Sequence, residues 1–100
     1  MEDLFIGKKC IVRCDTAGVY FGTVVSMTET NIVMKNVRKL WKWAGACAVE
    51  ELALNGVADP ENCKFTVVVP LIELSRKNET IPCTKKAIKS LSEVKEWKKD

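Results

Sequence analysis

The sequence predicts a small, β-rich α+β domain: a five-stranded barrel or curled antiparallel sheet with an inserted helix and a C-terminal helix. Three observations predict this class. Residues 9–43 have strand-like alternation interrupted by turn signals. Residues 44–54 change to helical spacing and are rich in Ala, Val, Glu and Leu. The chain has no repeat, linker or low-complexity tract, so residues 1–100 are expected to form a single domain.

The first two predicted strands cover residues 9–14 and 19–27, where side chains alternate between two faces. Gly18 ends the turn between them, because glycine supplies positive φ without steric cost. Gly22, in the middle of the second strand, predicts a bulge or a sharp bend. Such a bend curves a small sheet towards a barrel.

A third strand is predicted over residues 32–40, extending as far as residue 43, after a turn at residues 28–31. The inserted helix covers residues 44–54. The Asn-Gly pair at residues 55–56 ends it, since glycine is favoured just past a helix C-terminus.

The next segment returns to strand-like patterns. Residues 59–62 predict a turn or a short helical cap. Residues 65–74 predict a long apolar strand, in which Pro70 requires either an edge position or a break. A polar turn at residues 75–79 and a short strand at residues 80–83 follow.

Thr84 is the expected N-cap of the C-terminal helix. The apolar stripe of this helix consists of Ala87, Ile88, Leu91 and Val94. Lys85 and Lys86 lie in the first turn, where they oppose the helix dipole at a cost of ~0.5 kcal/mol each. A bound anion would explain them, because helix N-termini favour anions, and chance placement is the alternative.

The formal net charge of +3 is unevenly distributed. Residues 1–43 carry seven bases and four acids (+3), residues 44–63 four acids and no base (−4), and residues 64–100 nine bases and five acids (+4). This layout favours an anionic partner for the basic ends. It would also let the acidic segment of one copy meet a basic segment of the next in a homo-oligomer. Solvated surface charge is the alternative.

Five cysteines, at positions 10, 14, 47, 63 and 83, include no Cys-x-x-Cys pair, and the chain contains no histidine. On a strand, Cys10 and Cys14 would lie ~13 Å apart, too far to share a metal or a disulfide. We therefore expect reduced, partly buried thiols and neither metal nor cofactor. With no nucleophile–base set or Gly-rich phosphate loop, the chain is not expected to be an enzyme.

The sequence favours a cytoplasmic protein that is not bound to a membrane. The longest apolar run, residues 66–72, is too short to cross a bilayer. Residues 1–5 contain acids where a secretory signal has a basic region.

The candidate site is the segment 35–43, Lys-Asn-Val-Arg-Lys-Leu-Trp-Lys-Trp. Cations beside aromatic faces suit a ligand that is both anionic and flat, such as a nucleotide or a nucleic-acid strand. Strand alternation would place Lys39, Trp41 and Trp43 on one face. If that face points inward, the tryptophans are core residues instead. The candidate ligand-binding residues are Arg13, Tyr20, Lys35, Arg38, Lys39, Trp41, Lys42, Trp43, Lys85 and Lys86.

Two segments resemble the Sm-like proteins, which are small five-stranded barrels of the SH3 type. A strand, the turn ending in Gly18 and residues 19–24 are together similar to the first two Sm strands, and residues 31–38 to the third. The inserted helix and the lack of the second Sm signature are departures. The resemblance implies an SH3/Sm-like barrel and RNA binding by a ring of subunits.

A resemblance over nearly the whole chain is carried by residues 11–13, 17–23, 36–46 and 81–84. These segments resemble an uncharacterised family of small tailed-bacteriophage proteins. The resemblance implies expression in the cytoplasm of an infected bacterial host, where thiols stay reduced. Such proteins are often accessory factors that bind a host component, and several unrelated ones oligomerise and sequester nucleotide second messengers.

Three functions are consistent with these expectations. The first is a phage-encoded, non-catalytic protein that counteracts host defence by oligomeric sequestration of a cyclic or other nucleotide signal. The second is an Sm-like module for RNA or single-stranded DNA, whose binding would weaken steeply with salt. The third is a direct inhibitor of a host defence protein, since Trp and Arg are enriched in interface hot spots.

Overall fold

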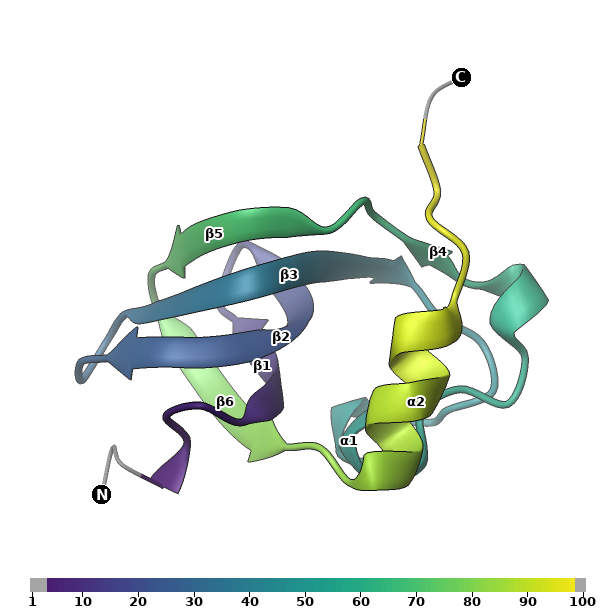
Figure 1. Cartoon of the computed structure of the whole chain (residues 1–100), viewed down its shortest axis with the longest axis horizontal. Helices are drawn as coiled ribbons and strands as arrows, with labels where there is room; N and C mark the ends of the chain where they lie inside the picture. Colours follow the sequence, from purple (N-terminus) through teal and green to yellow (C-terminus); the bar gives the residue numbers. More distant parts are fainter. Residues whose placement is uncertain (1–3, 99–100) are drawn as a thin grey trace.

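A computed structural model describes residues 4–98 of the chain. Residues 1–3, which belong to the segment 1–5 that argued against a secretory signal, lie outside the described residues. Figure 1 shows a curled sheet with its helices gathered at one end. The strands are β1 (Lys9–Cys14), β2 (Gly18–Met27), β3 (Ile32–Lys42), β4 (Lys64–Phe65), β5 (Val69–Leu74) and β6 (Lys77–Pro82). The helices are α1 (Val49–Asn55), the 3-10 helix η2 (Pro60–Asn62) and α2 (Lys85–Glu93).

The sheet is antiparallel, with strand order β4-β3-β2-β1-β6 and with β5 pairing β3 beside β4. The edge strands β5 and β6 are consecutive in the chain, which turns between them at Arg76 with φ 57°. Within residues 4–98 these two strands form no ladder with each other, so the sheet curls without closing. The β-rich α+β class and the curled antiparallel sheet are confirmed, whereas a closed SH3/Sm-like barrel is not formed.

The described strands number six rather than five, because the predicted strand over residues 65–74 is broken. Residues 66–68 separate β4 from β5, and Pro70 lies on the edge strand β5. The predicted turn at 75–79 is also too long, since β6 begins at Lys77. Both differences arise because pairing with β3 and β1 decides where an apolar or polar run becomes a strand.

The inserted helix begins at Val49, five residues later than predicted. Gly45 adopts φ 84° and approaches the 58–59 backbone so closely that a Cβ would lie 2.6 Å from the backbone nitrogen of Ala58. The chain before α1 therefore follows this close contact instead of a helical path. The predicted C-terminal helix is confirmed, and its N-cap Thr84 accepts a hydrogen bond from the N–H of Ala87 at 3.1 Å.

Two hydrophobic cores stabilise the sheet from opposite faces. The helix-side core joins β1, β2, β3 and β4 to the helices, with Phe65, Leu52 and Leu91 fully buried. The inner core fills the concave side of the curl and contains Val12 and Met34. β1 is thus buried on both faces. No helix within residues 4–98 has the length and apolar character needed to cross a membrane.

Candidate functional site

A bulge in β3 decides which side chains of the candidate segment reach the surface. Asn36, with φ 52°, and Val37 together lie opposite Gly22, because Phe21 pairs with Arg38 while Thr23 pairs with Lys35. A Cβ on Gly22 would lie 2.9 Å from Cγ2 of Val37, so only glycine fits opposite the bulge without displacing it. The irregularity predicted from Gly22 is confirmed, although the extra residue belongs to β3.

Beyond this bulge, Lys39 and Trp41 share a face of β3 while Leu40 between them is buried. Trp41 keeps 53% of its surface exposed, so the core alternative does not hold for this tryptophan. Trp43 lies past the end of β3 and packs against the helix-side core. The two tryptophans therefore do not form the shared face that alternation predicted, because the strand ends between them.

Four side chains from three adjacent strands form what we call the aromatic–lysine strip: Tyr20, Lys39, Trp41 and Lys64. Tyr20 on β2 is the cross-strand partner of Lys39, whose Nζ lies 6.0 Å from the centroid of the phenol ring. A second register shift leaves Trp41 and Lys42 together opposite Lys64 on β4. Nζ of Lys64 lies 5.6 Å from the Trp41 ring centroid. Each lysine of the strip thus lies at cation–π distance from one of its two rings.

Trp97 completes this surface from the far end of the chain. Its ring centroid lies 4.9 Å from that of Trp41, the planes are 23° apart, and 47% of Trp97 is exposed. Nζ of Lys64 lies 5.1 Å from the Trp97 ring as well. The tail after α2 runs beside β4, where the backbone N–H of Trp97 donates to the carbonyl of Phe65 (N···O 2.8 Å). The sequence-based prediction missed Trp97 and Lys64, although a third tryptophan in a lysine-rich segment was a usable signal.

Arg38 is the main correction among the candidate residues, since only 3% of it is exposed. Its Nη1 donates to the carbonyls of Leu91 (3.2 Å) and Val94 (2.8 Å) at the C-terminal end of α2, and its Nε donates to the carbonyl of Thr66 (3.2 Å). Burial lowers the pKa of this guanidinium, and the nearby Glu96 carboxylate partly offsets the effect. Arg38 therefore joins α2 to the sheet instead of meeting a surface ligand.

The other candidate cations lie away from the strip, except for Lys42. Arg13 pairs with Glu79 on the neighbouring β6 (3.4 Å), and Lys35 precedes the bulge on β3. Lys85 and Lys86 are exposed at the N-terminus of α2, while the strip meets the tail that follows its C-terminus. A nine-residue helix is ~13 Å long, so the structure does not bring these two lysines to the tryptophans.

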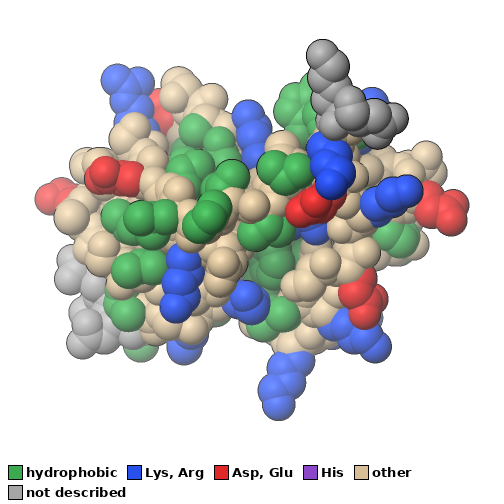
Figure 2. All heavy atoms as spheres, turned by 45° about the horizontal axis from the view of Figure 1, so that its top comes forward, with side chains coloured by type: hydrophobic (Ala, Val, Ile, Leu, Met, Phe, Trp, Pro, Cys, Tyr) green, Lys and Arg blue, Asp and Glu red, His purple; other side chains and the backbone are tan. Residues whose placement is uncertain are grey.

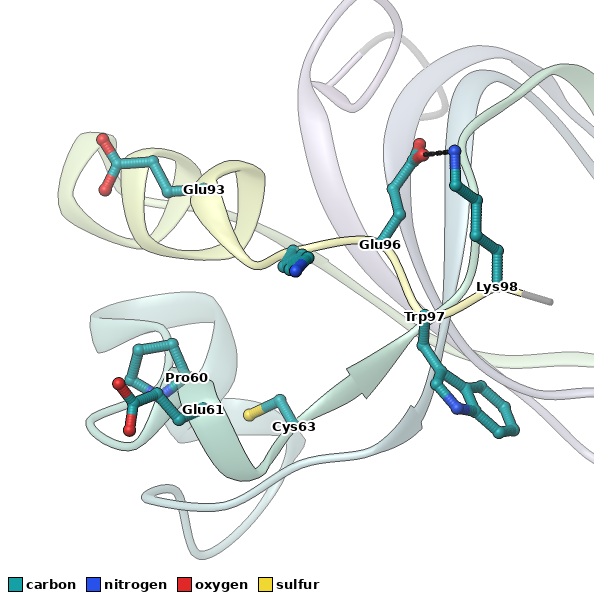
Figure 3. A pocket seen from close by; sticks show the side chains of 8 residues that line it. Pro60, Glu61, Cys63, Glu93, Glu96, Trp97 and Lys98 are labelled. Atoms are coloured by element: carbon teal, nitrogen blue, oxygen red, sulfur yellow. Dashed lines mark ion pairs between the residues drawn. The ribbon is translucent and has the colours of Figure 1, made fainter. Parts of the chain in front are cut away.

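An open cleft of ≈ 640 Å³ borders Trp97 between η2 and the tail. Figure 3 shows Glu93 of α2 on one side, Pro60 and Glu61 of η2 on the other, and Trp97 at its end. The carboxylate of Glu96 accepts the N–H of Val68 (3.2 Å) and pairs with Lys98 (3.9 Å). The lining contains Glu61, Glu93 and Glu96 against Lys95 and Lys98, a charge that disfavours phosphate groups.

No group of three His, Cys, Asp or Glu side chains within residues 4–98 could hold a metal ion. All five cysteines are free thiols, and only Cys47 is exposed. Burial raises the pKa of the Cys10 thiol to about 11 and that of Cys83 to about 12, so both stay protonated at neutral pH.

Comparison with protein-family models matches residues 7–91 to a domain of unknown function, DUF6948. Comparisons with curated proteins and with solved structures find no match. The matched family model carries no functional description, so the tailed-phage and Sm-like resemblances stay predictions.

Proposed function

The chain belongs to the DUF6948 family, whose model covers residues 7–91, and we propose that it is a non-catalytic protein that binds single-stranded nucleic acid on the aromatic–lysine strip. The observation that carries this proposal is the exposed indole of Trp41 with a lysine on either side of it, Lys39 along β3 and Lys64 across on β4. Bases stack on such rings without regard to sequence, and lysines neutralise the phosphates between them.

The shape of the strip fits a strand better than an isolated small molecule. Together with Trp97 it spans β2, β3, β4 and the tail, three strand spacings or ~14 Å, which matches roughly four stacked nucleotides at ~3.4 Å each. Lys42 on β3 and Lys64 on β4 are cross-strand partners, and a bound anion would reduce the repulsion between their like charges. On the face shown in Figure 2, the Lys and Arg side chains are scattered among hydrophobic and acidic side chains and form no continuous basic patch. Stacking would therefore contribute more to binding than a continuous basic coat.

A second candidate is capture of a small nucleotide, supported by the ≈ 640 Å³ cleft beside Trp97. Its volume lies within the range of small-molecule sites. In this second candidate function, a base stacks on the indole of Trp97 while the subunits of a homo-oligomer enclose the phosphates. Such enclosure is expected for sequestration of a signalling nucleotide. The carboxylates of Glu61, Glu93 and Glu96 oppose phosphate in the cleft itself, so the geometry favours strand binding over this second candidate.

The resemblance to tailed-phage proteins supplies a context for either ligand. A phage protein that covers single strands or removes a nucleotide signal would act against the defence of the infected cell. The experiment below therefore uses both RNA and DNA strands.

The test is fluorescence anisotropy with labelled 12-nucleotide RNA and DNA. Trp41→Ala is expected to weaken binding by roughly 5- to 150-fold, the range for loss of one stacked base. Leu71→Ala is the matched control, because Leu71 is an exposed hydrophobic residue (65%) on β5 that pairs with Lys35, on the other side of the β3 bulge from Trp41. This control is expected to bind like the unmodified protein.

Salt dependence separates the two candidates. With Lys39, Lys42 and Lys64 on phosphates, log K should fall against log salt with a slope of about −2, or roughly 20-fold between 50 and 200 mM. A small enclosed nucleotide should show a much weaker dependence. Equal binding of the strands by Trp41→Ala and by the unmodified protein would reject strand binding on the strip.

A further inference from the structure

We infer that the face of the Trp41 ring covered by Trp97 is a binding position for one nucleobase, which Trp97 fills in the ligand-free protein. This inference rests on the proposed function and assigns the two tryptophans different roles. Trp41 is the fixed stacking surface, and Trp97 is an exchangeable occupant.

The first supporting observation is the short distance between the two indole rings. At 4.9 Å between centroids and 23° between planes, the indoles touch each other. A base held between two rings needs two stacking intervals of ~3.4 Å, or ~7 Å in total. No base can therefore enter between Trp41 and Trp97 as they stand. A ligand reaches this face of Trp41 only by replacing Trp97.

The second supporting observation is that Trp41 is anchored in the sheet more firmly than Trp97 is anchored in the tail. Trp41 lies on β3, which pairs with β2 on one side and with β4 and β5 on the other, next to the fully buried Leu40. Trp97 lies beyond Val94, the last residue whose carbonyl Arg38 holds. Residues 95–98 are all exposed. The tail is thus the part of this surface that can leave while β3 stays in place.

Few contacts hold the tail down within the described residues. The N–H of Trp97 donates to the carbonyl of Phe65 (2.8 Å), and the carboxylate of Glu96 accepts the N–H of Val68 (3.2 Å). The indole stack adds a third contact. A nucleotide offers the same stacking contact and adds a phosphate.

Lys64 is positioned to serve either occupant. Its Nζ lies 5.6 Å from the Trp41 ring and 5.1 Å from the Trp97 ring, so it faces a π surface in the closed arrangement. When a nucleotide replaces Trp97, the same ammonium lies beside the base and can meet its phosphate. Exchange of an uncharged ring for a charged nucleotide therefore gains an ionic contact that Trp97 does not provide.

The test compares the strand affinity of the unmodified protein with that of its Trp97→Ala variant. Suppose that the form with Trp97 stacked on Trp41 is about ten times more populated than the form with Trp97 released. Removing Trp97 should then tighten binding of a 12-nucleotide strand by about the same factor. The variant keeps Lys64, Lys95 and Lys98, so its cationic groups are unchanged. Trp97→Phe, with a smaller ring, should have intermediate affinity. A double variant lacking both Trp41 and Trp97 should bind as weakly as Trp41→Ala alone.

A second readout follows the ring directly. In protein labelled with 5-fluorotryptophan, addition of the strand should move the Trp97 fluorine signal to the position of a free indole, while the signal of Trp43 stays unchanged. Weaker binding by Trp97→Ala, with Trp97 remaining stacked on Trp41, would overturn the inference and leave strand binding intact. Failure of both the unmodified protein and Trp97→Ala to bind any strand would overturn the proposed function and this inference together. Binding only by Trp97→Ala would support the exchange.

Discussion

Replacing Arg38 by Met tests how the sheet holds α2. The guanidinium makes three hydrogen bonds to the carbonyls of Thr66, Leu91 and Val94, and its charged plane lies 5.2 Å from the Phe65 ring centroid. Methionine keeps much of the apolar volume but donates none of these bonds. The carbonyls of Leu91 and Val94 would then end α2 without this partner.

The magnitude follows from those three bonds. A hydrogen bond from a charged group contributes ~1.5–3 kcal/mol, so the gross loss is about 4–9 kcal/mol. Relief of the buried charge offsets part of it, because burial lowers the pKa of Arg38 and its Nη2 has no hydrogen-bond partner within residues 4–98. The net loss should be ~3 kcal/mol, or about 15 °C in Tm for a 100-residue domain.

Urea denaturation followed by circular dichroism measures this loss, with Arg13→Met as the matched control. Arg13 is exposed and forms one ion pair with Glu79, so its replacement should change the free energy of unfolding by no more than ~0.5 kcal/mol. Arg38→Lys keeps the charge without the planar fork and should recover at most half of the loss. If Arg38→Met unfolds within ~1 kcal/mol of the unmodified protein, the three hydrogen bonds do not hold α2 as we infer.

Three further predictions concern packing, titration and the exposed indole. Gly22→Ala should cost ~1–3 kcal/mol in urea denaturation because its Cβ meets Val37; an unchanged midpoint would mean that the bulge adjusts freely. The thiol pKa values of Cys10 (about 11) and Cys83 (about 12) exceed the ordinary 9.0, so above pH 9 the unfolded chain binds fewer protons than the folded one. Stability should therefore fall from pH 9 to 11, by up to ~1.4 kcal/mol per pH unit for each thiol, and a flat profile of urea midpoints would contradict the burial of these thiols. Trp41→Ala should change the free energy of unfolding by less than ~1 kcal/mol, since the residue is 53% exposed. A larger loss of stability in a thermal melt would indicate that Trp41 is a core residue.

Local patterns in the sequence were sufficient for most of the elements. Alternation over residues 9–14 predicted β1 with its exact bounds, and Thr84 predicted the start of α2. Gly22 marked the irregularity between β2 and β3. These features depend on strand periodicity, hydrogen bonds at a cap and the lack of a Cβ, which act between residues close in sequence.

The candidate site could be located on the sequence but not assembled from it. The segment 35–43 contains Lys39 and Trp41 of the strip, whereas Lys64 and Trp97 come from β4 and the tail. Arg38 carries the same charge as its neighbour Lys39, yet it is buried because the carbonyls it binds belong to α2 and the chain after β4. Exposure and partners depend on contacts between segments 28 to 56 residues apart, for which a single sequence contains no periodic signal. The sequence thus predicted Lys39 and Trp41 as members of this surface, whereas Lys64, Trp97 and the burial of Arg38 were decided by long-range packing.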